Sequence, residues 1–128
     1  MKIKVLEHGS ADCPLIRIYG NEPDVFEQFR QAFEQLANGN VAEVLLTELP
    51  GVEPLGGCCL ITQAGRRDEG IVRKGENVFF WVLTRDSWDD VALLIKPFCS
   101  DEAVGYQWLE GFQRATDVRV LVSLDGCW

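Results

Sequence analysis

The sequence predicts an α+β fold, with a mainly antiparallel sheet of about five or six strands and two or three helices packed on it. Three observations carry this prediction. Short stretches of alternating apolar and polar residues recur along the chain, as in half-buried strands. Other stretches have apolar residues at helical spacing between start and stop signals. Finally, 128 residues, 47% of them hydrophobic, fit one folded domain spanning 1–128.

Two strands are expected near the N-terminus. Ile3 and Val5 alternate with lysines, which is typical of a strand with one buried face. The apolar stretch 15–19 follows after a turn-like segment at 9–12. We therefore expect these two segments to pair as an antiparallel hairpin.

A helix is predicted after this hairpin. Pro23 suits the first helical position, where its missing N–H costs nothing, and Asn38-Gly39 provides a left-handed stop. Four apolar side chains between these signals fall on one face, and we assign them to the core: Phe26, Phe29, Phe33 and Leu36.

The middle of the chain alternates strands with turns. We expect strands over 41–49 and 58–62, separated by the irregular stretch 50–57, whose prolines and glycines disfavour regular pairing. The segments 71–74 and 77–83 then form a hairpin around Gly75-Glu76. Both faces of 77–83 are apolar, so this strand is expected inside a sheet.

The remaining segments are two predicted helices and a strand. We interpret 87–96 as a helix because Ser87 and Asp90 approximate a capping box and Pro97 follows, with a return strand of the hairpin as the alternative. A further helix is expected over 101–115, with Val104, Trp108, Leu109, Phe112 and Ala115 as its apolar stripe. The stretch 118–122 alternates as a last strand.

The formal charge is −8, from 20 acidic and 12 basic residues. An acidic surface repels phosphate backbones and anionic lipid heads, so we expect neither nucleic acid nor a membrane as partner. A cationic protein is the partner that such a field attracts. The alternative is that the charge serves only solubility.

The five cysteines indicate no disulfide framework. They form an odd set without a C-x-x-C pair: Cys13, Cys58, Cys59, Cys99 and Cys127. No apolar stretch is long enough for a signal sequence or a membrane span. We therefore expect a cytoplasmic protein with reduced thiols.

No catalytic residue, metal site or cofactor is predicted. His8 is the single imidazole, and its pairing with Cys58 or Cys59 is weighed against a structural role for these thiols. Zinc needs four convergent ligands at short paired spacings, and Asp86, Asp89 and Asp90 lack calcium-loop spacing. The glycines of 50–57 make no phosphate-binding motif.

Acidic residues gathered near an aromatic are the predicted partner-binding site. Carboxylates around a large aromatic anchor suit Lys- and Arg-rich surfaces. The alternatives are acids that merely favour helix N-termini, a Trp88 that points into the core, or a site at Glu43, Glu48 and Glu53 or at Asp68 and Glu69. The predicted site comprises Asp86, Trp88, Asp89, Asp90, Asp101 and Glu102.

Parts of the C-terminal half are similar to a known class of protein. The segments Phe79-Phe80-Trp81, Trp88-Asp89-Asp90, 105–109 and 123–128 resemble the small acidic α+β immunity proteins that accompany secreted bacterial toxins. The resemblance implies a cytoplasmic bacterial inhibitor that binds a cognate toxin and masks its active site. From the charge we expect that toxin domain to be basic, and we expect the chain itself to be a non-enzymatic monomer or homodimer. The alternative function is a small-molecule binder or cysteine-dependent enzyme with a pocket near 50–57.

Overall fold

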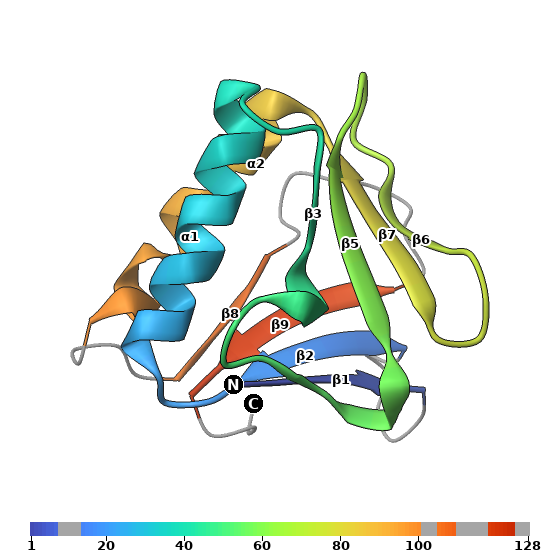
Figure 1. The fold of residues 1–128 in the computed structure, drawn as a ribbon, viewed down its shortest axis with the longest axis vertical. Coiled ribbons are helices and arrows are strands. Elements are labelled where there is room, and N and C mark those ends of the chain that lie inside the picture. Colours follow the sequence, from blue (N-terminus) through green and yellow to red (C-terminus); the bar gives the residue numbers. More distant parts are fainter. Residues whose placement is uncertain (8–13, 101–104, 110–117, 125–128) are drawn as a thin grey trace.

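A computed structural model of the chain describes residues 1–7, 14–100, 105–109 and 118–124. Two helices pack side by side against one side of a core that two sheets enclose from other sides (Figure 1). The fold class is therefore α+β, as predicted.

The first sheet has five strands in the order β4-β1-β2-β9-β8. Their bounds are Lys2–Leu6 for β1, Leu15–Tyr19 for β2, Glu53–Pro54 for β4, Tyr106–Trp108 for β8 and Arg119–Ser123 for β9. β1 and β2 form the expected antiparallel hairpin. β2 and β9 lie parallel, with Ile16 beside Val120 and Ile18 beside Val122, so both strands present one buried aliphatic face to the core.

The second sheet has four strands in the order β3-β5-β7-β6. Their bounds are Glu43–Leu45 for β3, Cys59–Ala64 for β5, Gly70–Arg73 for β6 and Val78–Leu83 for β7. β6 and β7 form the predicted hairpin, and β7 lies inside the sheet, parallel to β5. The prediction from its two apolar faces is confirmed: Phe79 and Trp81 on one side and Val82 on the other are buried.

Several expectations about the strands were wrong. The sheets are mixed rather than mainly antiparallel, there are two of them, and the described residues form nine strands instead of five or six. Each parallel pair joins strands that are not consecutive in the chain, and alternation patterns carry no information about such pairing. The predicted strand 41–49 shortens to β3, followed by a 3₁₀ turn, η1 (Leu46–Glu48). The stretch 50–57 is not wholly irregular, since β4 pairs with β1. Pro54 is tolerated there because β4 is an edge strand, where its missing N–H leaves no bond to a further strand unmade.

Two α-helices lie in the described part of the chain. α1 spans Pro23–Asn38 and ends at Gly39, whose φ of 77° is left-handed, as the sequence predicted. α2 spans Arg85–Ile95, so the helical interpretation is confirmed and the return strand is not formed. Its cap is Thr84 rather than Ser87, since the Thr84 hydroxyl accepts a hydrogen bond from the Ser87 N–H at 3.2 Å. A 3₁₀ turn, η3 (Lys96–Cys99), follows α2 directly.

The helix predicted over 101–115 is contradicted where the structure describes it. Tyr106–Trp108 form β8, which pairs antiparallel with β9. Gly105 has φ of 81°, a conformation that an α-helix does not contain. The strand is also favoured by two aromatic residues, which fit a pleated surface, whereas glycine weakens a helix. The predicted stripe positions Val104, Phe112 and Ala115 lie outside the described residues.

Candidate functional site

The predicted acidic site places three carboxylates on the outer face of α2. Asp86, Asp89 and Asp90 are exposed and lie at helical positions i, i+3 and i+4. Leu93 continues the same face at i+7, and its side chain is 61% exposed. We call these four residues the α2 surface. Sequence reasoning missed Leu93, although its spacing from Asp86 was the available signal.

The aspartates of the α2 surface form no ion pair with a described residue. Arg85 is adjacent in sequence, but its guanidinium turns to the end of α1. Its Nε donates to the Ala37 carbonyl at 3.1 Å and its Nη2 to the Asn38 carbonyl at 2.8 Å. The negative charge of the α2 surface is therefore not compensated locally.

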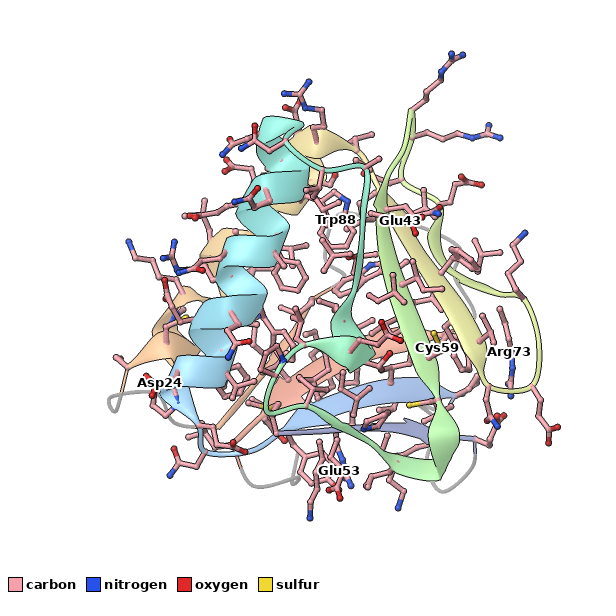
Figure 2. The ribbon with its side chains drawn as sticks, viewed as in Figure 1. Asp24, Glu43, Glu53, Cys59, Arg73 and Trp88 are labelled. Atoms are coloured by element: carbon pink, nitrogen blue, oxygen red, sulfur yellow. The ribbon has the colours of Figure 1, made fainter. Side chains whose placement is uncertain are left out.

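Trp88 lies in the core and not at the surface. Its side chain is fully buried between α1 and the second sheet, where it stacks on Phe33 with ring centroids 5.3 Å apart (Figure 2). Its Nε1 donates to the Gln63 carbonyl at 2.8 Å. An aromatic residue flanked by aspartates on a helix faces either solvent or core, and packing decides between them. The apolar group that α2 exposes is Leu93 instead. The predicted site residues Asp101 and Glu102 lie outside the described residues.

One alternative acid has a structural role. The Asp68 carboxylate accepts the Thr84 N–H at 2.8 Å and the Ser87 hydroxyl at 2.7 Å, so it secures the start of α2. Glu43 on β3 is exposed and accepts a bond from the Gln63 amide at 3.0 Å (Figure 2). Asp68 is therefore occupied inside the fold, whereas Glu43 remains accessible to a partner.

The negative charge is unevenly distributed along the chain. The described residues contain 11 basic and 14 acidic side chains, a difference of −3 out of the formal −8. The segments 8–13, 101–104, 110–117 and 125–128 contain the other six acids and one arginine. The described part as a whole is thus only weakly negative, and its acidic side chains outnumber basic ones only on particular surfaces, such as the α2 surface.

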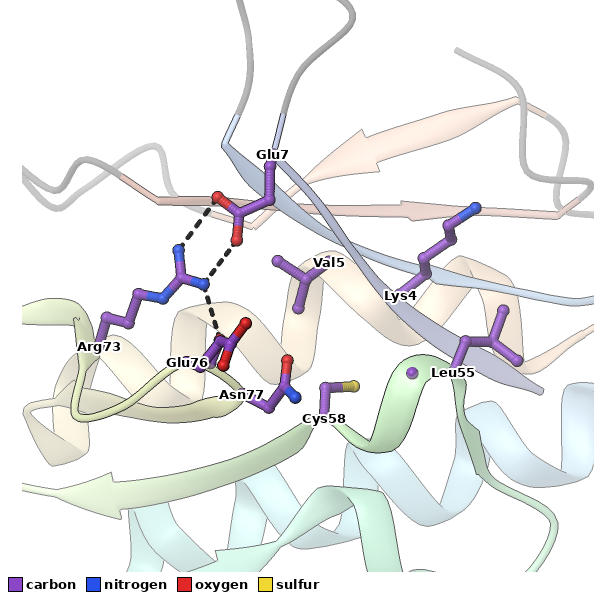
Figure 3. A pocket seen from close by; sticks show the side chains of 9 residues that line it. Lys4, Val5, Glu7, Leu55, Cys58, Arg73, Glu76 and Asn77 are labelled. Atoms are coloured by element: carbon purple, nitrogen blue, oxygen red, sulfur yellow. Dashed lines mark hydrogen bonds and ion pairs between the residues drawn. The ribbon is translucent and has the colours of Figure 1, made fainter.

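A pocket of about 430 Å³ lies where the second function hypothesis expected one, beside the 50–57 stretch (Figure 3). β1 contributes Lys4 and Val5, and the 3₁₀ turn η2 (Leu55–Gly57) contributes Leu55 and Gly56. The opposite wall comes from the turn between β6 and β7.

An ion pair closes one end of this pocket. The Arg73 guanidinium donates to both Glu7 carboxylate oxygens, at 3.1 and 2.5 Å, and to the Glu76 carbonyl at 2.6 Å. The Glu7 hydrogen bonds are the main cause that raises the pKa of Arg73, and the negative charges of Glu7 and Glu76 act in the same direction. Because Arg73 belongs to β6 and Glu7 follows β1, the pair links the two sheets across the pocket.

The thiol in the pocket wall is not activated. Cys58 is buried, its Sγ donates to the Ile3 carbonyl at 3.5 Å, and burial raises the pKa of the thiol. A nucleophilic cysteine needs the opposite shift. His8, which the sequence offered as its partner, lies outside the described residues. Within the described part, no three His, Cys, Asp or Glu side chains converge as a metal site requires.

Comparison with known proteins adds no assignment: no family model, no curated protein and no solved structure matches the chain. No helix in the described ranges is both long and apolar enough to cross a bilayer.

Proposed function

We propose that this chain is a non-enzymatic module that binds a cationic protein through the α2 surface. The observation that carries the proposal is the combination of three exposed, uncompensated aspartates with an exposed leucine on one helical face. Acids at a helix start also favour the helix dipole, but Asp89 and Asp90 lie beyond the first three residues of α2. Helix stability alone therefore does not account for the set.

This surface has the two elements that recognition of a basic protein needs. Carboxylates steer a positively charged partner and set its orientation, which raises the association rate. A desolvated apolar side chain slows dissociation, and Leu93 is available for that role. The sequence resemblance leads us to propose an immunity protein of the bacterial cytoplasm, which would neutralise a basic toxin domain by covering its active surface.

A partner search with a matched control tests the proposal. The immobilised chain is used to capture bacterial proteins at low and high ionic strength, and each captured protein is then purified and titrated. Changing Asp86, Asp89 and Asp90 to asparagine is expected to weaken binding of the true partner about tenfold or more, since each exposed charge contributes up to about 1 kcal/mol.

The control changes Glu53, Glu69 and Glu76 to glutamine. These three glutamates are also exposed, and changing them removes the same charge away from α2. Equal weakening by both triple variants would show a general charge effect and would contradict the α2 surface. A captured partner whose binding ignores salt and both variants would contradict electrostatic recognition altogether.

A second candidate is a small-molecule binder that uses the pocket beside Cys58. The specific observation is the pocket itself, which combines the apolar Val5 and Leu55 with the charged Lys4 and Glu76. The raised pKa of the thiol argues for binding and against nucleophilic catalysis. Labelling with iodoacetamide near neutral pH, located by mass spectrometry, is expected to modify Cys58 slowly. Rapid modification would favour the enzyme instead.

A further inference from the structure

A second surface suited to a cationic partner lies between α1 and β3, apart from the α2 surface. The open groove there has a volume of about 310 Å³. Its apolar wall consists of Ala32, Val41, Val44 and Leu49, and its rim of the glutamines Gln28, Gln31 and Gln35. It belongs neither to the α2 surface nor to the pocket beside Cys58.

One wall of the groove is an unpaired sheet edge. Among the described residues, β3 is the terminal strand of its sheet and pairs only with β5. In an antiparallel pair, every second residue bonds to the neighbouring strand. The Ala64 N–H donates to the Ala42 carbonyl at 3.1 Å, so Ala42 and Val44 are the residues that bond to β5. The backbone N–H and carbonyl of Glu43 and the N–H of Leu45 therefore point to the free edge, where an added strand would bond, while the Leu45 carbonyl caps η1.

The opposite wall is a row of side-chain amides. Gln28, Gln31 and Gln35 lie at i, i+3 and i+7 on α1. Among the described residues, Gln28 and Gln35 make no side-chain hydrogen bond, and Gln31 donates only a long one of 3.5 Å to Glu27. An extended chain in the groove would meet backbone groups on one side and free amides on the other.

The charge around the groove selects a cationic segment. From 31 to 65 the chain contains no lysine, arginine or histidine and four glutamates. Two of these, Glu43 and Glu48, directly precede residues that line the groove. On α1, the single Arg30 pairs with both Glu27 and Glu34, so this helix face also retains a negative surplus. An acidic or neutral segment would gain no such attraction.

We propose that this groove binds an extended, cationic segment of the partner protein, whose backbone adds to the free edge of β3. The class of partner rests on the proposed function, while the site and the extended conformation are new. Alternating side chains of an added strand face opposite ways. The segment would therefore place apolar residues in the groove and lysines or arginines toward the glutamates.

A displayed library of random twelve-residue peptides is the probe, selected on the full chain. We expect enriched peptides in which lysine or arginine alternates with apolar residues. Gln35→Arg adds a long cationic side chain at the rim and is expected to weaken their binding at least tenfold. Arginine is a good helix former and Gln35 is exposed, so the variant should fold, which its thermal unfolding checks.

Asn21→Arg is the matched control, because it adds the same charge at an exposed position before α1 and should leave peptide binding unchanged. Bound peptide should also shift the backbone amide signals of Glu43 and Leu45 in an NMR titration. The proposal is overturned if no peptide is enriched, if Gln35→Arg has no effect, or if sedimentation shows that a second copy of the chain occupies the edge.

The asparagine variant of the α2 surface separates the two proposals. If it abolishes peptide binding while Gln35→Arg does not, the groove proposal fails and the α2 surface stands. If it weakens the whole partner but not the peptides, and Gln35→Arg weakens the peptides, both surfaces are supported.

Discussion

Two neighbouring tryptophans in the core differ in one hydrogen bond. Trp81 and Trp88 are both fully buried and meet edge to face, with ring centroids 4.9 Å apart. The Nε1 of Trp88 donates to the Gln63 carbonyl, whereas the buried Nε1 of Trp81 has no partner among the described residues. Burying an unpaired N–H costs free energy, so the two indoles stabilise the fold unequally.

Replacing each tryptophan by phenylalanine tests this difference. Both changes remove the same atoms from a fully buried site, but only Trp88→Phe removes a hydrogen bond, one of those that the Gln63 carbonyl accepts. We expect Trp88→Phe to lower the free energy of unfolding by about 1 kcal/mol more than Trp81→Phe. Urea denaturation of the two variants measures it. Equal losses, or a larger loss for Trp81→Phe, would contradict the assigned roles.

Glu27 provides a test of pH dependence at the residue scale. The hydrogen bond from Arg30 lowers the pKa of this carboxyl to about 2. A carboxyl with a depressed folded-state pKa stabilises the protein above its unfolded pKa and loses this effect as pH falls through the folded value. We expect the NMR titration of Glu27 to show a midpoint near 2 that moves up to the ordinary glutamate range in Arg30→Gln. An unchanged midpoint would contradict the pairing.

At the scale of elements, Arg85 joins the two helices. Its guanidinium, from the first turn of α2, binds the carbonyls of Ala37 and Asn38 at the end of α1. A helix C-terminus has unpaired carbonyls and a negative dipole, so a cation is favourable there. The contact is close: a Cβ on Gly39 would lie 2.8 Å from the Arg85 Cζ.

Gly39→Ala is therefore expected to destabilise the protein for two reasons. Alanine disfavours the φ of 77° by about 1 kcal/mol, and its methyl group displaces the Arg85 guanidinium. In an Arg85→Ala background only the first cost remains. A double-mutant cycle by thermal unfolding should thus show a smaller effect of Gly39→Ala in that background. Additive effects would contradict the contact.

Elements with local signals were predictable, whereas those fixed by distant contacts were not. Pro23 and Gly39 fix the ends of α1 through their own backbone preferences, and Pro97 marked the end of the helix predicted over 87–96. The segment around Trp108 has helical spacing too, but pairing with β9 and the backbone of Gly105 make it a strand.

The same distinction applies to the candidate site. Helical spacing placed Asp86, Asp89 and Asp90 together because their separation along one helix is fixed locally. The orientation of Trp88 depended on a space between α1 and β5 that no local pattern describes. The groove between α1 and β3 likewise arises from packing of two elements, so only its charge, the cation-free segment 31–65, was visible beforehand.

At the scale of the whole molecule, one core joins both sheets to both helices. A single cluster of buried residues includes Ile18 of β2, Phe33 of α1, Leu60 of β5, Trp81 of β7 and Val91 of α2. No element could leave this cluster without exposing apolar surface of the others, which costs about 25 cal/mol per Å². The described part of the fold should therefore unfold as one cooperative unit.

This expectation is tested by asking whether two spectroscopic signals change at the same denaturant concentration. In a variant with Trp108 and Trp128 changed to phenylalanine, tryptophan fluorescence reports the core around Trp81 and Trp88, between the helices and the second sheet, while far-ultraviolet circular dichroism averages over both sheets. In guanidinium chloride we expect the two signals to give one transition with the same midpoint and slope, as two-state domains of this size do. An earlier dichroism transition would show that the first sheet opens separately. In that case the Arg73–Glu7 pair, which links the sheets at the pocket, would be the contact to examine, and Arg73→Gln should widen the gap between midpoints.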